Sequence, residues 1–479
     1  MAAALEKMHQ PAGVGEAAAS SASLPPPTVR VLDTTLVQPS SGGPAPPETS
    51  LPLTFYDVFW VHTPPVQRVF FYRLAPDADA DAILANLRDS LSHAVRAFYP
   101  LAGRLRLTPG TANHYELHYR PGDAVAFAVA EYDGEQDFES LAADEPREVA
   151  AIAPLAPPLP AGGAVLALQV TLLPARAGRG LALGVTVHHA ACDGAGSTHF
   201  LHTWAAACVG TGTPPPPPVI DRTLISDTRG LYDVFCPPAS STGAEVGFVP
   251  MPKDQLLATF TLSRAHLQRI KDALAAAAHG GALPPPRCTS LVAALGFVWS
   301  CYHQAKLLRA GAGGDQTYFL LSVDHRSRLN PPLPAEYLGN CVAAAIAAAP
   351  RTELEEASVS GGGLLTACAA IAAGIEDAVS VLATETMDQR MERVVEAAAS
   401  GSMLTVAGSP RFRVYELDMG FGRPAKVDVV SVARTGAVAV GGDGGGMEVG
   451  VALPPAGMDA FRKSFADAVA GLGMDTGAQ

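Results

Sequence analysis

Cysteine, charge and aromatic side chains are all scarce in this sequence of 479 residues. Its seven cysteines are odd in number and scattered, and no Cys-x-x-Cys pair occurs, which argues against a disulfide framework and a zinc clamp. Charged residues make up 16% of the chain, and 33 basic against 46 acidic residues leave a net charge of −13. Because no block of Lys or Arg occurs either, we expect no nucleic acid or membrane partner.

Long apolar runs are missing as well. No stretch of about 18 strongly apolar residues occurs, so no membrane-spanning helix is predicted. The first residues carry Glu6 and Glu16 where a secretory signal would carry basic residues, and no Arg precedes Arg30. Free thiols and the missing signal together predict a cytoplasmic protein. With 48% hydrophobic residues, the chain is long enough for two or three domains.

The hydrophobic pattern predicts helices and strands on both sides of a proline-rich segment. Residues 1–27 have no periodicity and are predicted to be a flexible leader. The run of prolines at 214–218 can form neither a helix nor a central strand, which predicts an inter-domain crossover within residues 210–245. We therefore expect an α/β protein with two domains of similar size, residues 28–209 and 246–479.

Individual elements follow from spacing and turn residues. Apolar residues three and four apart predict a helix over 77–98, and two apolar runs predict a buried hairpin of strands at 164–174 and 181–187. In the second half, the runs at 426–432, 436–442 and 446–453 are typical of a small antiparallel meander, with Gly441–Gly446 as a turn.

The segment 188–194, His-His-Ala-Ala-Cys-Asp-Gly, is the sharpest candidate site, because it follows a buried strand and opens a helix. His189 is a candidate general base, with the Asp193 carboxylate nearby. A structural histidine and a turn-forming aspartate fit the same pattern. His188, His189, Asp193 and His199 could ligate a metal by type, but neighbouring strand residues face opposite ways and no HExxH helix occurs. Cys192 is more typical of a packed thiol than of a nucleophile.

Five segments in the same order resemble the plant BAHD acyltransferases, which use coenzyme A thioesters. Residues 189–194 resemble the family's HxxxDG motif, and Gly-x-Ser-x-Gly, the usual hydrolase motif, is absent. Residues 53–60 (LTFYDVFW) and 98–105 (FYPLAGRL) resemble two blocks of the first domain. Residues 323–341 resemble the block of the second domain, and 418–422 (DMGFG) resemble the DFGWG motif.

The DFGWG-like segment departs from the family at two positions. Met419 replaces the usual Phe and Phe421 replaces the usual Trp, while Asp418, Gly420 and Gly422 match. Because both replacements are apolar, we expect the loop to persist as a structural element away from the thioester, with its apolar side chains anchored to the second domain.

The resemblance implies a fold like that of chloramphenicol acetyltransferase, with the active-site channel between two domains. It implies that His189 takes the proton from an acceptor hydroxyl that attacks the thioester directly, without an acyl-enzyme. It also implies that Asp193, next to Gly194, turns away from the substrate and pairs with an arginine, for which we choose Arg326.

The predicted helix start at Thr289 and Ser290 is a candidate site for coenzyme A phosphate, although a plain N-cap explains these residues equally well. No metal and no bound cofactor is predicted, and acyl-CoA would be a co-substrate.

The residues and the resemblance together predict an acyl-CoA-dependent O-acyltransferase. The segment YLGNC (337–341) resembles YFGNC, which is common among enzymes that acylate sugars of anthocyanins and other flavonoid glycosides with malonyl or hydroxycinnamoyl groups. We expect a monomer that acts on a plant phenolic, namely a flavonoid or anthocyanin glycoside. The alternative, motivated by Met419 and Phe421, is a catalytically silent homologue that binds a ligand or a partner protein.

Overall fold

The structure is a computed structural model that describes most of the chain. The predicted leader, residues 1–27, and part of the predicted linker lie outside the described residues. The described ranges are 29–40, 42–176, 179–211, 213–238, 254–279, 288–307, 315–355, 362–380, 393–394, 396–400, 402–442 and 445–474.

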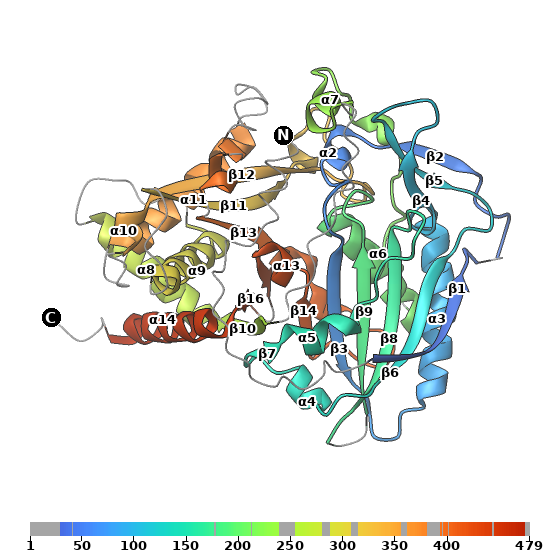
Figure 1. The fold of residues 1–479 in the computed structure, drawn as a ribbon, viewed down its shortest axis with the longest axis horizontal. Helices are drawn as coiled ribbons and strands as arrows, with labels where there is room; N and C mark the ends of the chain where they lie inside the picture. The colour runs from blue at the N-terminus through green and yellow to red at the C-terminus, as the bar shows by residue number, and fades with distance from the viewer. Residues whose placement is uncertain are drawn as a thin grey trace.

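The first half of the chain is built around a six-stranded mixed sheet in the order β1-β6-β8-β9-β3-β14 (Figure 1). Helices α3 (Ala80–Ala97) and α6 (Gly194–Val209) pack against one face and share its core. A smaller sheet in the order β2-β5-β4 lies beside it. The strands are β1 Val29–Val37, β2 Thr49–Pro52, β3 Val66–Arg73, β4 Arg104–Leu107, β5 Tyr115–Tyr119, β6 Val125–Tyr132, β8 Leu166–Pro174, β9 Arg179–Val187 and β14 Lys426–Val429.

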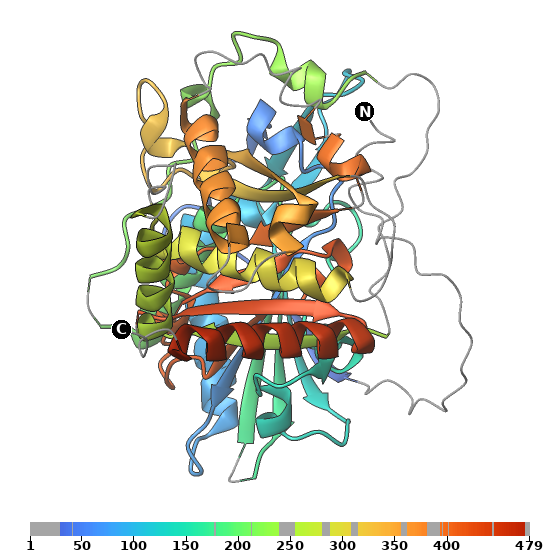
Figure 2. The ribbon, with the colours of Figure 1, turned by 90° about the vertical axis from the view of Figure 1, so that its left-hand side faces the viewer.

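The second half is built around a seven-stranded sheet in the order β12-β11-β13-β15-β16-β10-β7. Figure 2 shows the long helices of this half on its outer side, with α14 in red at the front. The strands are β7 Arg147–Glu148, β10 Leu256–Leu262, β11 Gln316–Asp324, β12 Val342–Pro350, β13 Met403–Ala407, β15 Val438–Gly441 and β16 Met447–Leu453. The helices are α8 Arg264–His279, α9 Ser290–Leu307, α10 Arg351–Glu355, α11 Gly362–Ser380 and α14 Pro455–Met474.

Short helical segments join these elements. They are α2 Phe55–Val58, η1 Tyr99–Ala102, α4 Phe138–Leu141, α5 Val149–Ile152, η2 Ala153–Leu155, η3 Arg222–Leu224, α7 Leu231–Phe235, η4 Arg326–Arg328, η5 Pro410–Phe412, η6 Val414–Glu416 and α13 Val432–Thr435.

The predicted helix and hairpin of the first half are confirmed. Helix α3 begins after Asp79, whose carboxylate accepts hydrogen bonds from the backbone N–H groups of Asp81 and Ala82. Its apolar stripe, including Leu87, Leu91 and Val95, is fully buried. Strands β8 and β9 pair antiparallel along their whole length, as two apolar runs separated by a short turn predict.

The predicted C-terminal meander is wrong in one strand. Strands β15 and β16 do pair antiparallel, but β14 leaves them and pairs antiparallel with β3 in the first sheet, with Lys426 opposite Phe71. In return β7, from the first half of the chain, pairs with β10 in the second sheet. The local sequence pattern cannot reveal this exchange, because it indicates that a segment is a strand but not which sheet the strand joins.

A buried ion pair joins the two exchanged strands. The Arg147 guanidinium of β7 donates to both carboxylate oxygens of Asp428 in β14, at 2.7 and 3.1 Å. The two halves are therefore tied together by strand exchange as well as by side chains. The domain boundaries at residues 209 and 246 stay a prediction.

Helix α11 is by length and composition apolar enough to cross a membrane, the one such helix among the described residues. Buried core helices have the same length and composition, so this property does not by itself indicate a membrane-spanning helix. Its buried residues Leu364, Ala367, Cys368 and Ile371 belong to the core of the second half.

Candidate active site

The candidate histidines lie on the turn between strand β9 and helix α6. β9 ends at Val187 and α6 begins at Gly194, so residues 188–193 make the whole connection. Asp193 is the N-cap of α6, and its carboxylate accepts a hydrogen bond from the backbone N–H of Gly196 at 3.0 Å. At Gly194 an added Cβ would lie 2.5 Å from the ring of Phe412, so a larger residue would force this ring of the second half to move.

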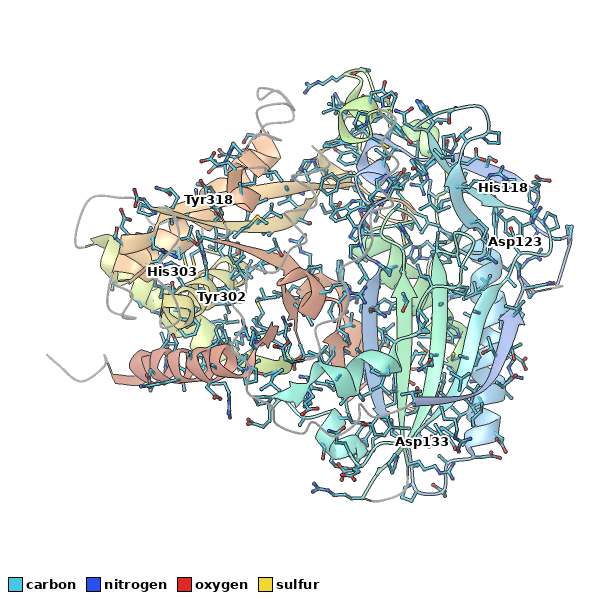
Figure 3. The ribbon with its side chains drawn as sticks, in the orientation of Figure 1. His118, Asp123, Asp133, Tyr302, His303 and Tyr318 are labelled. Carbon is cyan, nitrogen blue, oxygen red and sulfur yellow. The ribbon has the colours of Figure 1, made fainter. Side chains whose placement is uncertain are left out.

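A cavity of about 2000 Å³ passes this turn and is lined by both halves of the chain. Trp60, His189 and Gly194 line it from the first half, and Thr289 and Ser322 line it from the second. The side chains labelled in Figure 3, among them His118 and Tyr318, are not among the lining residues. The cavity is large enough for an extended ligand that reaches the histidine turn.

The His189 ring is held by stacking and by its backbone. It lies against the indole of Trp60, with ring centroids 3.8 Å apart and planes tilted by 20°. The Asn340 side-chain amide donates to the His189 carbonyl oxygen at 2.8 Å. Nδ1 is buried and has no hydrogen-bond partner of standard geometry among the described residues, although the Asn340 side chain lies close enough to raise the pKa of the ring.

Burial lowers the pKa of His189, and the nearby Asp193 carboxylate opposes this shift only in part. The imidazole is therefore neutral near pH 7, the form that can accept a proton. Burial also lowers the pKa of His188, to about 4, with His189 and His62 contributing next. His188 is 8% exposed, and its Nδ1 accepts a hydrogen bond from the backbone N–H of Ala190 at 3.2 Å. Of the two neighbours, His189 alone lines the cavity.

Asp193 and Arg326 are brought together as a buried bidentate ion pair. The guanidinium donates to the two carboxylate oxygens at 2.8 and 3.0 Å, and the backbone N–H of Cys341 donates to the same carboxylate at 3.1 Å. Arg326 also donates to the carbonyl oxygens of Tyr337 and Gly339. Burial alone would lower the pKa of Arg326, but the Asp193 carboxylate outweighs it and raises the pKa. Asp193 thus joins the histidine turn to the second half.

A second buried carboxylate, Asp57 of α2, holds the same turn from the other side. It accepts hydrogen bonds from the backbone N–H and side-chain amide of Asn340, at 2.8 and 2.9 Å. Arg222 donates to Asp57 at 3.0 Å and to the Ala191 carbonyl oxygen at 3.2 Å. The chain from Asp57 through Asn340 to the His189 carbonyl connects three segments that are far apart in the sequence.

Sequence reasoning missed Trp60, Asp57, Asn340 and Arg222 as site residues. Three of them lie in segments that were recognised as family blocks: Asp57 and Trp60 in residues 53–60, and Asn340 in YLGNC. Block membership was the available signal, but it did not separate side chains that face the histidine turn from those that fill the core. Arg222 lies in the crossover, where no pattern marked it.

Thr289 and Ser290 lie at the start of α9 and line the cavity. The Thr289 hydroxyl accepts a hydrogen bond from the backbone N–H of Val292 at 3.2 Å, which is the geometry of a plain N-cap. The Ser290 hydroxyl accepts from the Lys271 ammonium at 2.8 Å. The proximity of this lysine is compatible with an anion, and a role in binding coenzyme A stays a prediction.

The loop at 418–422 is not among the lining residues of the cavity. The Asp418 carboxylate accepts hydrogen bonds from the backbone N–H groups of Gly420 and Gly422, whose φ angles of +85° and +120° favour glycine. The expected anchorage of the apolar residues was wrong: Met419 is fully buried in the core of the first half, and Phe421 packs against Tyr72 there. The loop follows the exchanged course of β14 rather than the second sheet.

The remaining candidates are set aside by their surroundings. Cys192 is buried, and burial raises the pKa of its thiol to about 12, so it is not a thiolate nucleophile near neutral pH. The His199 Nε2 lies 2.8 Å from the carbonyl oxygen of Pro216. In the described part of the chain, no three His, Cys, Asp or Glu side chains come together as metal ligands would.

Comparison with known proteins gives agreement over nearly the whole chain. The sequence profile of the Transferase family matches residues 28–468. A malonyl-CoA:anthocyanidin 5-O-glucoside-6''-O-malonyltransferase of Arabidopsis thaliana is 32% identical over 465 residues, which cover 91% of this chain and 97% of that protein. A coumaroyl-CoA:anthocyanidin 3-O-glucoside-6''-O-coumaroyltransferase of the same plant is 28% identical, over 92% of this chain and 97% of that protein.

Solved structures show the same fold. Vinorine synthase matches with a TM-score of 0.67 at 18% identity, over 90% of this chain and 96% of that one. TRI101 of F. graminearum, complexed with coenzyme A and T-2 mycotoxin, matches with a TM-score of 0.59 at 15% identity, over 87% of this chain and 97% of that one. The predicted α/β class, with two domains arranged as in chloramphenicol acetyltransferase, is confirmed.

Proposed function

The chain belongs to the Transferase family, the family of the BAHD acyltransferases, and we propose that it transfers an acyl group from coenzyme A to a hydroxyl of a plant phenolic glycoside. The flavonoid and anthocyanin glycosides are the proposed acceptors, because the similar malonyl- and coumaroyltransferases are named for anthocyanidin glucosides or, more broadly, for a phenolic glucoside. Malonyl-CoA and hydroxycinnamoyl-CoA are the proposed donors.

The observation that carries this proposal is the neutral, oriented His189 in a cavity lined by both halves. In the proposed step the imidazole accepts the proton of the acceptor hydroxyl while that oxygen bonds to the thioester carbonyl carbon. The tetrahedral intermediate then expels the thiolate of coenzyme A, which takes the proton from the imidazolium. One ester bond forms, one thioester bond breaks, and no acyl-enzyme is needed.

The residues that orient His189 need not touch the substrate. Trp60 supports one face of the ring, and Asn340 holds the His189 carbonyl. Asp193 with Arg326, and Asp57 with Arg222, fix the two ends of the turn, so that the base does not have to be ordered during the reaction. Thr289 and Ser290 remain candidates for the phosphates of coenzyme A.

The test is to incubate purified protein with malonyl-CoA or coumaroyl-CoA and a panel of flavonoid glycosides, and to measure release of the coenzyme A thiol. Release that requires both the donor and a glycoside is expected. Absence of release with every pair would favour the alternative of a silent binding protein. That alternative rested on Met419 and Phe421, which are not among the lining residues of the cavity.

We also propose that the protein acts in the cytoplasm as a monomer, without nucleic acid or membrane partners. The seven unpaired cysteines, six of them buried and Cys288 half-buried, support a reducing compartment. Cell fractionation and light scattering at several protein concentrations test the location and the oligomeric state.

A further inference from the structure

Arg68 is a buried cation in the wall of the cavity. It lies on β3, is 6% exposed and is one of the lining residues. Its guanidinium donates to the hydroxyls of Ser197 at 2.6 Å and Thr198 at 3.2 Å, on helix α6. No carboxylate lies within ion-pair distance of it in the described part of the chain. Among the described residues its Nε has no hydrogen-bond partner, a feature that it shares with Arg147, Arg222 and Arg326.

This arrangement differs from that of the other buried arginines, each of which has a carboxylate: Arg147 has Asp428, Arg222 has Asp57 and Arg326 has Asp193. A buried cation without a counter-ion is unfavourable for the folded protein. Burial lowers the pKa of Arg68 to about 10, which still leaves it charged near pH 7. The group is therefore a positive charge with neutral partners in a cavity that admits ligands.

The position of Arg68 relates it to the histidine turn. Strand β3 pairs with β9 so that Arg68 lies opposite Val185 and Val66 lies opposite Val187, two residues before His189. The hydroxyls that hold the guanidinium belong to the start of α6, which begins at Gly194 directly after the turn. A helix N-terminus adds a further positive potential there.

We propose that Arg68 binds the free carboxylate at the end of the acyl group, so that the donor is a dicarboxylic acyl-CoA such as malonyl-CoA. This inference rests on the proposed function and narrows its donor. A hydroxycinnamoyl group carries no charge and would leave Arg68 unpaired. One guanidinium in a buried site suits a single carboxylate in bidentate contact. The phosphates of coenzyme A carry several charges and suit exposed cations such as Arg328 and Arg411, which also line the cavity.

The test compares donors in the wild type, in Arg68→Gln and in Arg68→Lys. Glutamine keeps a hydrogen-bonding amide but has no charge, and its shorter side chain does not reach as far as the Nη atoms of arginine. We expect the ratio of kcat/KM for malonyl-CoA to that for acetyl-CoA to fall about 30-fold in Arg68→Gln, equivalent to about 2 kcal/mol. Arg68→Lys should lose less, because it keeps the charge without the bidentate geometry. The matched control is Arg328→Gln, an exposed arginine of the same cavity, where the ratio should stay within about twofold.

An unchanged ratio in Arg68→Gln would overturn the inference. If kcat/KM falls equally with both donors, Arg68 acts on coenzyme A or on the fold, and if it falls with neither, Arg68 has no role in binding the donor. A measurement on the wild type covers the case in which the variants do not fold. The methyl ester of malonyl-CoA should be at least about 30-fold poorer than malonyl-CoA by kcat/KM, and equal use of the two would refute the contact.

Failure of the proposed function looks different. If the wild type releases no thiol from any donor, calorimetry still measures the affinities of malonyl-CoA and acetyl-CoA, and equal affinities would reject the carboxylate site. If the wild type transfers coumaroyl groups but not malonyl groups, the acyltransferase proposal stands and the role of Arg68 does not.

Discussion

Breaking the ion pair between Asp193 and Arg326 from either side should lower the free energy of unfolding, because the remaining charge stays buried without its counter-ion. In Asp193→Asn the Arg326 guanidinium stays buried. Its remaining partners are the carbonyl oxygens of Tyr337 and Gly339 and the carboxylate of Asp324, which is exposed. In Arg326→Gln the Asp193 carboxylate keeps two backbone N–H donors but loses its counter-ion. Removing one member of a buried pair typically costs about 3–5 kcal/mol of unfolding free energy. We expect each single variant to lose an amount of unfolding free energy within that range.

The double variant separates pairing from two independent effects. Because it strands neither charge, its loss should be smaller than the sum of the single losses by about 1–3 kcal/mol. The free energy of unfolding is measured from urea titrations, beside kcat for thiol release. Since the pair holds the turn that carries His189, activity should fall with stability in all three variants.

Arg147→Gln is the matched control for this cycle. It breaks another buried bidentate pair, with Asp428. Asp428 lines the cavity, but neither Arg147 nor Asp428 contacts the turn that carries His189 through a hydrogen bond among the described residues. It should lower stability by a similar amount while kcat falls much less. Strict additivity in the Asp193 and Arg326 cycle would refute their coupling, and an equal fall of kcat in the control would show that activity follows global stability rather than the turn.

Three further outcomes are expected. In His189→Ala the turnover should fall by about 10² to 10⁴-fold, while the affinity for coenzyme A is retained. The loss in His188→Ala should be milder, and the opposite ranking would show that His188 is the base. Because the folded pKa of His188 is about 4, below its usual 6.5, its contribution to stability is complete above pH 6.5 and is lost as the pH falls toward 4; His188→Gln should therefore flatten the urea stability profile in that window, by up to about 3 kcal/mol in total. Met419→Phe with Phe421→Trp should change stability by at most about 2 kcal/mol and leave the donor ratio within about twofold, and a large shift in donor ratio without a change in the thermal melt would place the loop at the acyl group.

Much of the fold could be predicted because its elements are specified locally. The apolar stripe and N-cap of α3, and the paired apolar runs of β8 and β9, lie within short stretches of sequence. The histidine turn was found for the same reason, since the strand, the turn residues and the helix start are consecutive. The pairing of Asp193 with Arg326 is different, because only the family resemblance suggested it and no pattern in the residues does.

The rest could not be predicted because it depends on contacts between distant segments. Strand β14 has the same pattern in either sheet, and only the packing of the two halves decides that it pairs with β3. Asp57 and Arg222 are 165 residues apart and each is unremarkable in its own segment. Arg68 lies in a strand that is otherwise mostly apolar, and its lack of a carboxylate partner becomes visible only when its neighbours in the fold are known.

The buried charges around the cavity divide by whether the protein itself supplies the partner. Replacing a buried ion pair by apolar residues is often neutral or stabilising, so stability alone does not explain two such pairs beside one turn. Both pairs hold the backbone of the turn that carries His189, so their role is to position this residue. Arg68 has only hydroxyl partners, and its charge has no geometric task that a neutral side chain could not perform. A charge that the fold leaves without a carboxylate, in a cavity open to ligands, supports our proposal that the ligand supplies the counter-ion and that the donor carries a carboxylate.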